Sequence, residues 1–185
     1  AHTTTDFGTS SISNVGGNDA FLAKYDSNGN FAWVQSFGSD GTDIAWDVVL
    51  DKDENPYISG YFNGESITIG ASTYTNVQNG ISEMFMAKYD PNGNVSWSLV
   101  GTSTLREQSI AMASDQNAIY LTGWTDGFVT TFGNVTIPGG EVFVASVDPS
   151  GSVNWVENIE GEGFANGIHS DGEYVYAAGR VTNLA

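Results

Sequence analysis

The 185-residue sequence contains no cysteine and very few basic residues. The absence of cysteine excludes disulfides, zinc–thiolate sites and thiol nucleophiles. Lys and Arg total 5 against 22 Asp and Glu, which gives a formal net charge of −17. That balance argues against nucleic acid and anionic membranes, whose phosphates need a basic face. It suits cations or basic partners instead.

Long apolar segments and helical patterns are also lacking. No apolar run approaches the roughly 18 residues needed to span a bilayer. The start, residues 1–3 (AHT), shows neither the basic nor the apolar region of a signal peptide, so the chain is either mature or cut from something longer. No segment shows sustained apolar spacing of three and four among helix formers, which predicts a chain without substantial helix.

Glycine, aromatic and β-branched residues are abundant in place of the missing types. The chain has 23 Gly, 5 Trp and 8 Tyr but 4 Pro. This composition is typical of β-strands joined by tight turns. Hydrophobic residues make up 40% of the chain, enough for a packed core, so a disordered chain is excluded. The composition therefore predicts an all-β fold.

One phrase, built around an acidic turn, occurs three times at intervals of about 60 residues. It reads KYDSNGNFAW at 24–33, KYDPNGNVSW at 88–97 and SVDPSGSVNW at 146–155. A second phrase, Tyr-x-x-Gly, alternates with it and begins at Tyr57, Tyr120 and Tyr176. A third, looser phrase precedes each acidic turn. Every stretch belongs to one of these phrases, so no linker or second domain is expected.

Each repeat unit is expected to supply about four strands, for example Ile44–Leu50, Pro56–Phe62, Met84–Tyr89 and Val95–Val100. Short turns between neighbouring strands predict an antiparallel meander. Four-stranded units at a period of roughly 50–60 residues indicate β-propeller blades. A β-solenoid would need shorter, parallel coils, and a sandwich would not repeat its sequence three times.

The phrases DAFLAKYDSNGNFAWVQSFG at 19–38 and DVVLDKDENPYISGYF at 47–62 resemble the SBBP β-propeller repeat of bacterial surface and secreted proteins. The resemblance covers essentially the whole chain in three units. It is weakest in the third, where Ser146 replaces Lys24 and Lys88. It implies a β-propeller, export from a bacterium and often display at the cell surface, in some bacteria as a type IX secretion substrate. It implies no catalytic residues.

The blades are expected to divide unequally within a single segment, 1–185. The units fall at about 1–38 (a half blade), 39–101, 102–161 and 162–185 (a half blade). The first half would supply outer strands and the last half inner strands, so the two ends are complementary. Three blade equivalents are too few to close a propeller. A piece of a propeller of about six to eight blades, a dimeric ring of about six blades and an open arc on a partner are the three alternatives.

The acidic turns have two interpretations, a calcium loop or a hairpin turn. An EF-hand loop has Gly at position six, whereas the turn at 26–30 (DSNGN) has it at position four. That spacing fits a type I turn with Gly in a left-handed bulge, and Pro91 and Pro149 suit its second position. The loop at 51–55 (DKDEN) is richer in oxygen ligands, but its counterparts are poorer. We expect no cofactor and no metal residue, with Ca²⁺ as the disfavoured alternative.

Catalytic machinery is not recognisable in the sequence. The two histidines are His2, near the terminus, and His169, which we interpret as a packing residue on an inner strand. No nucleophile elbow, phosphate-binding loop or metalloprotease motif is present. A rival enzyme hypothesis places converging carboxylates around Asp47 and His169, but the aligned Ala111, Ala113 and Gly167 indicate an inert channel. We expect no enzyme and no catalytic or cofactor-binding residues.

The tryptophans fall into two groups. Those that recur at one position are expected to pack between blades, and they are Trp33, Trp97 and Trp155. Trp46 and Trp124 do not recur. Their aligned positions hold Ile110 and Asn166, and Phe62 and Val181, respectively. A Trp outside the repeat is free to bind something, for example by stacking on a sugar, so both are candidate ligand-binding residues, against the alternative of ordinary packing.

The function that these patterns favour is a noncatalytic extracellular or cell-surface scaffold for protein interaction, adhesion or assembly. The alternative is a carbohydrate-binding module that uses exposed Trp46 or Trp124. The expected partner is a protein or the remaining blades of a larger propeller. A homodimer and a glycan are further alternatives, and neither nucleic-acid binding nor membrane insertion is expected.

Overall fold

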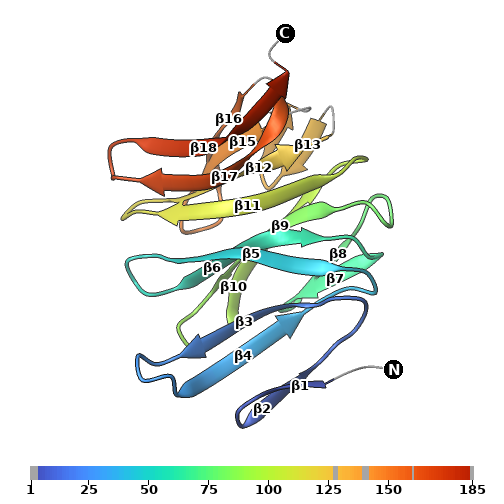
Figure 1. Cartoon of the computed structure of the whole chain (residues 1–185), viewed down its shortest axis with the longest axis vertical. Helices are drawn as coiled ribbons and strands as arrows, with labels where there is room; N and C mark the ends of the chain where they lie inside the picture. The colour runs from blue at the N-terminus through green and yellow to red at the C-terminus, as the bar shows by residue number, and fades with distance from the viewer. Residues whose placement is uncertain (1–3, 127–128, 139–141, 160, 184–185) are drawn as a thin grey trace.

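The computed structural model describes residues 4–126, 129–138, 142–159 and 161–183. These residues form 18 strands and no helix, which confirms the all-β prediction. Within them, nothing has the length and apolar character of a membrane-spanning helix. Figure 1 shows the sheets following one another along the long axis, from the N-terminal end to the C-terminal end.

Two four-stranded antiparallel meanders form the centre of the molecule. The second blade consists of β5 (Asp43–Leu50), β6 (Pro56–Phe62), β9 (Glu83–Tyr89) and β10 (Val95–Thr102). The third blade consists of β11 (Glu107–Ser114), β12 (Ile119–Thr125), β15 (Val142–Val147) and β16 (Val153–Ile159). Within each blade, strands that follow one another in this order pair with each other, as in the blades of a β-propeller.

A two-stranded half blade lies at each end of this stack. The N-terminal half blade pairs β3 (Ala20–Tyr25) with β4 (Phe31–Phe37). The C-terminal half blade pairs β17 (Glu162–Ser170) with β18 (Val175–Asn183). The repeated phrases make β3–β4 the counterpart of β9–β10, and β17–β18 the counterpart of β5–β6. The blades thus have the predicted form, while the unit bounds within one segment stay a prediction.

The loose third phrase forms short hairpins that the sequence did not reveal. They are β1 (Thr4–Phe7) with β2 (Ser10–Ser13), β7 (Ser66–Ile69) with β8 (Ser72–Thr75), and β13 (Val129–Phe132) with β14 (Val135–Pro138). β13 also pairs with β10, through Gly101 and Phe132. A hairpin inserted in the third blade thereby extends the sheet of the second blade and ties the two blades together.

The core lies between the blades in two clusters of buried side chains. One cluster joins the N-terminal half blade to the second blade and includes Phe85. The other joins the second and third blades and includes Met84 and Met86. β9 serves both clusters because successive side chains of a strand point to opposite faces. This explains why its sequence, EMFMAKY, is almost continuously apolar.

The acidic turns close hairpins, as predicted. Their glycines have φ values of 83°, 87° and 94° at Gly29, Gly93 and Gly151. Each of these amides donates to the carbonyl of the turn's Asp at 3.0 Å, and a bulge interrupts each hairpin. In the part of the chain that the structure describes, no group of three or more His, Cys, Asp or Glu could hold a metal ion. The absence of a cofactor stays a prediction.

Candidate interaction surfaces

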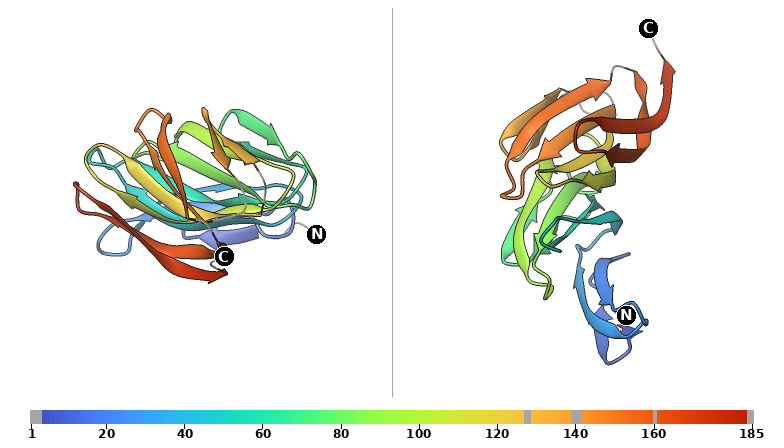
Figure 2. Two further views of the ribbon diagram at one scale, coloured as in Figure 1. Left: turned by 90° about the horizontal axis from the view of Figure 1, so that it is seen from above. Right: turned by 90° about the vertical axis from the view of Figure 1, so that its left-hand side faces the viewer.

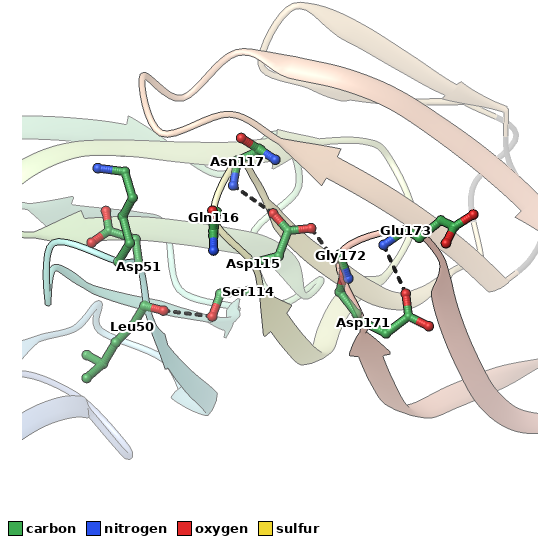
Figure 3. Close-up of a pocket in the computed structure, with 11 residues that line it drawn as sticks. Leu50, Asp51, Ser114, Asp115, Gln116, Asn117, Asp171, Gly172 and Glu173 are labelled. Atoms are coloured by element: carbon green, nitrogen blue, oxygen red, sulfur yellow. Dashed lines mark hydrogen bonds between the residues drawn. The ribbon is translucent and has the colours of Figure 1, made fainter.

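Three turns, each within a hairpin that carries the Tyr-x-x-Gly phrase, converge on an acidic depression, shown in Figure 3. Its volume is about 680 Å³, and its lining comes from the turns after β5, β11 and β17. Asp51, Asp115 and Asp171 occupy the equivalent position in the three turns. Three successive repeat units therefore contribute to one concave surface.

Each of these aspartates is held by the tyrosine of the Tyr-x-x-Gly phrase. The tyrosine hydroxyl donates to the carboxylate at 3.1, 2.7 and 3.0 Å in the pairs Tyr57–Asp51, Tyr120–Asp115 and Tyr176–Asp171. Sequence reasoning missed these pairs, although both members recur and their spacing stays at five or six residues. The carboxylates thus stabilise the hairpins that carry them.

Hydrogen bonding keeps the depression negatively charged. Burial of Asp51 disfavours its ionised form, but hydrogen bonds from Asn55, from backbone amides and from Lys88 outweigh this and lower its pKa to about 2. Burial is likewise outweighed at Asp115, whose pKa is lowered, and backbone amides lower the pKa of Asp171. A carboxylate with a lowered pKa is a poor general base near neutral pH, so these groups supply charge rather than proton transfer.

Contacts between blades make the depression a preformed surface. The hydroxyl of Ser114 donates to the carbonyl of Leu50 at 2.7 Å, and the hydroxyl of Ser170 donates to Asp115 at 3.0 Å. Lys88 forms a largely buried ion pair with Asp51 at 3.2 Å. Each turn is therefore linked to a neighbouring part of the molecule as well as within itself.

The recurring tryptophan joins consecutive blades, as predicted. The indole Nε1 of Trp33 donates to the carbonyl of Pro91 at 3.1 Å, and that of Trp97 donates to the carbonyl of Pro149 at 3.1 Å. In both cases the acceptor lies in the acidic turn of the next blade. A Cβ added to the glycine of that turn would lie 3.0 or 3.1 Å from the indole. The glycine therefore allows the ring to pack directly on the turn.

The N-terminal half blade borders a cleft that contains the candidate Trp46. Trp46, on β5, is 50% exposed and packs at a tilt against Tyr61, with ring centroids 6.4 Å apart. It lines the cleft together with Phe21 and Val48. A neighbouring cleft of about 690 Å³ follows β3 toward its acidic turn. Among the described strands, β3 pairs with β4 alone, whereas its counterpart β9 pairs on both sides, and an unpaired edge recruits other strands.

The strand register corrects the alignment of the other candidate, Trp124. Trp124 directly follows Gly123 on β12, and Tyr61 directly follows the equivalent Gly60 on β6. The counterparts of Trp124 are therefore Tyr61 and Arg180, not Phe62 and Val181, because the glycine opposite the bulge sets the register. Trp124 is half-buried, with the guanidinium of Arg106 6.0 Å from its ring centroid. A ligand at Trp46 or Trp124 stays a prediction.

Asp47 and His169, the two residues of the rival enzyme hypothesis, do not have the surroundings that this hypothesis predicts. The carboxylate of Asp47 accepts a hydrogen bond from the amide of Met112 at 2.7 Å, just after the bulge of β11. Asp47 thereby links the second blade to the third. His169 is exposed on β17, so its interpretation as a packing residue was wrong. His2 lies outside the described residues.

Comparison with known proteins supports the broader statement about the repeat. No protein-family model matches the chain, so membership of the SBBP family is not confirmed. An uncharacterized WD repeat-containing protein of Acanthamoeba polyphaga mimivirus is 29% identical over 169 residues. The match covers 80% of this chain and 12% of the length of that relative. WD repeats form propeller blades, so this similarity agrees with the propeller-like blades described above.

Proposed function

We propose that the chain is a noncatalytic β-propeller scaffold that binds a protein partner at the acidic depression. The observation that carries this proposal is the convergence of three repeated Asp–Tyr turns on one concave surface. Its carboxylates are held in place and keep lowered pKa values, which favours recognition over proton transfer. The similarity to a WD repeat-containing protein supports the propeller part of the proposal.

The partner that fits this surface is a basic segment of another protein. The chain carries a net charge of −17, and the depression brings three of its aspartates together on one surface. Lys52, on the rim, is already paired with Asp53 at 2.8 Å. Opposite charges across an interface steer encounters and favour the right partner, and this attraction weakens as salt increases. A segment rich in Lys and Arg is therefore the expected ligand.

Fluorescence anisotropy with a labelled Lys- and Arg-rich peptide tests the proposal. The same peptide with every basic residue replaced by Gln is the neutral probe. Glu173→Lys and Gln116→Lys reverse or add charge at exposed positions of the lining, outside the Asp–Tyr pairs. We expect the double variant to bind about tenfold more weakly, equivalent to about 1.4 kcal/mol.

Glu65→Lys is the matched control, because Glu65 is exposed and does not line the depression. It should weaken binding much less than the double variant. Equal binding of the basic and neutral peptides, or an equal loss in the control, would contradict a role for the depression.

Location outside the cell is part of the proposal and has a separate basis. The resemblance of residues 19–38 and 47–62 to SBBP repeats supports a secreted or cell-surface protein of a bacterium, with a role in adhesion or assembly and type IX secretion as its route. Surface biotinylation of intact source cells should label the protein. Recovery in the cytoplasmic fraction alone would overturn this part.

Glycan binding is a second candidate function, favoured by the surroundings of Trp46. Its half-exposed indole stands beside Tyr61 in a cleft, and aromatic faces of this kind can stack on sugars. A glycan array should then show binding that Trp46→Ala removes and Trp124→Ala leaves intact. If the protein bound no glycan on the array, or if Trp46→Ala left the binding unchanged, this function at the cleft would be excluded.

A further inference from the structure

In each complete blade, the hairpin that carries the Tyr-x-x-Gly phrase pairs with the hairpin that carries the acidic turn. β6 pairs with β9, and β12 pairs with β15. The glycine of the Tyr-x-x-Gly phrase lies opposite a phenylalanine in both, as Gly60 opposite Phe85 and Gly123 opposite Phe143. Both phenylalanines are fully buried. The repeat thus defines one fixed register between the two kinds of hairpin.

The half blades carry the same residues without this pairing. Phe21, the counterpart of Phe85, is 50% exposed, and Tyr176, the counterpart of the buried Tyr57, is 55% exposed. Within the described residues, β3 pairs with β4 alone and β18 with β17 alone. Figure 1 and Figure 2 show these two sheets at opposite ends of the stack. Each end therefore exposes one half of a contact that is buried inside the molecule.

The tryptophan contact between blades is divided between the ends in the same way. Trp155 stands at the position of Trp33 and Trp97 but is 38% exposed. At the other end, a Cβ on Gly29 would meet none of the described residues within 4 Å, whereas the equivalent Gly93 and Gly151 lie against indole rings. The C-terminal end thus offers the tryptophan and the N-terminal end offers the turn.

We propose that these ends bind each other between two copies of the chain. β18 of one copy adds to the free edge of β3 of the other, and Trp155 packs on the turn that contains Gly29. The register of the complete blades places Tyr176 opposite Lys24, and Gly179 opposite Phe21. This inference goes beyond binding at the acidic depression and is independent of it.

The geometry of the repeat favours a closed dimer. Each copy carries both halves of the contact, so two copies can make it twice about a twofold axis. An unrelated strand could satisfy the backbone edge of β3 by β-augmentation. Such a strand would lack both the Tyr-x-x-Gly spacing and a tryptophan that could pack on the turn that contains Gly29.

Directed disulfide formation tests the register. The chain has no cysteine, so each variant carries a single thiol. Ala177 corresponds to Ile58 and Leu121, which lie opposite Ala87 and Ala145, the counterparts of Ala23. A mixture of Ala23→Cys and Ala177→Cys chains should therefore form a cross-linked heterodimer on oxidation. Ala178→Cys is the matched control, because a shift of one residue moves the thiol to the other face of the strand.

The solution mass tests the interface as a whole. Light scattering at micromolar concentration should give twice the 19.6 kDa of one chain. Trp155→Ala and Phe21→Glu, both at exposed positions, should each return the mass to that of one chain. Trp124→Ala should leave the dimer intact, and circular dichroism should show the same β-structure in all variants. A wild-type mass of one chain, or equal cross-linking of Ala177→Cys and Ala178→Cys, would overturn the proposal.

Discussion

Two of the junctions between blades share the tryptophan contact, from Trp33 and from Trp97, but differ in the buried acid that they contain. At the junction of the N-terminal half blade with the second blade, Asp43 is buried and accepts hydrogen bonds from the amide and the hydroxyl of Ser39, both at 2.7 Å. At the junction of the second and third blades, Glu107 is also buried. Its Oε2 accepts from Thr130 at 2.5 Å, but its Oε1 has no hydrogen-bond partner among the residues that the structure describes.

Asp43 and Glu107 occupy the same position of the repeat, so the repeat sets the apolar contact, while the kind of acid and its hydrogen-bond donors set the electrostatics of each junction. Burial raises the pKa of Glu107 to about 8, aided by the negative charge of Glu83 and opposed by the bond from Thr130. Burial also raises the pKa of Asp43, but the two bonds from Ser39 oppose it. The junction of the second and third blades should therefore be the more sensitive to pH.

Replacement of Glu107 by Gln should have the largest effect, and its size should depend on pH. The folded-state pKa of Glu107 lies above its unfolded value of 4.5, so the folded protein retains a proton that the unfolded chain releases. The contribution of Glu107 to stability is therefore complete below about pH 4.5 and is lost as the pH rises toward 8. Glu107→Gln removes this loss, by up to about 5 kcal/mol at pH 9.

Urea unfolding of both proteins between pH 4.5 and pH 9 measures the effect. Asp43→Asn is the matched variant. An amide cannot accept both bonds from Ser39 as a carboxylate does, and this loss opposes the gain from removing a carboxyl whose pKa burial raises, so its stability relative to the wild type should change less with pH than that of Glu107→Gln. A constant difference between Glu107→Gln and the wild type across this range would mean that the carboxyl of Glu107 does not titrate in the folded protein as proposed.

Substitution of the repeated lysine should give the second largest difference in stability between the junctions. Lys88 pairs with Asp51 where both side chains are largely buried, and it also donates to the carbonyl of Pro149 at 3.2 Å. Its counterpart Lys24 is exposed and donates to the carbonyl of Pro91 at 3.1 Å. Loss of one partner from a buried ion pair is costly, so Lys88→Met should destabilise the protein by about 3 kcal/mol.

Lys24→Met is the control. With both variants in the Trp155→Ala background, which keeps β3 free of contacts with a second copy, it should cost less than about 1 kcal/mol, as is usual for an exposed contact. Thermal unfolding of both variants at pH 7 gives the comparison. Similar melting temperatures for the two would show that burial does not distinguish the junctions.

The parts of this structure that follow local rules could be predicted from sequence. Pro56–Phe62 was predicted with the observed bounds, and the acidic turns were identified because Gly, and in two of the three copies Pro, occupies its preferred position. The short hairpin strands of four residues, such as Ser72–Thr75, were missed because Ser and Thr give no clear alternation of apolar and polar residues. The buried state of Glu107 was missed because burial at a junction depends on the neighbouring blade.

Substitution of the glycines should distinguish an acidic turn that contacts a tryptophan from one that does not. Gly151 has φ of 94° and lies against Trp97, whereas Gly29 has φ of 83° and open space around its Cβ position. Ala in the left-handed region costs about 1 kcal/mol at either site. Contact with Trp97 should raise the loss for Gly151→Ala to about 2 kcal/mol or more.

Both substitutions are best measured by urea unfolding in the Trp155→Ala background, which keeps Gly29 free of contacts with a second copy. Equal losses would show that the turn at Gly151 moves away from Trp97 at little cost.

The indole hydrogen bonds should give the smallest effect and should be the same at both junctions. Trp33→Phe and Trp97→Phe keep an aromatic ring but remove the Nε1 donor to Pro91 or Pro149, each at 3.1 Å. A neutral hydrogen bond contributes about 1 kcal/mol, so each variant should lose about that much in urea unfolding. Trp155→Phe, measured in the monomer, should lose less because Trp155 is 38% exposed. If the stability losses of Trp33→Phe and Trp97→Phe differed by more than about 1 kcal/mol, the repeated tryptophan would not contribute equally to the two junctions.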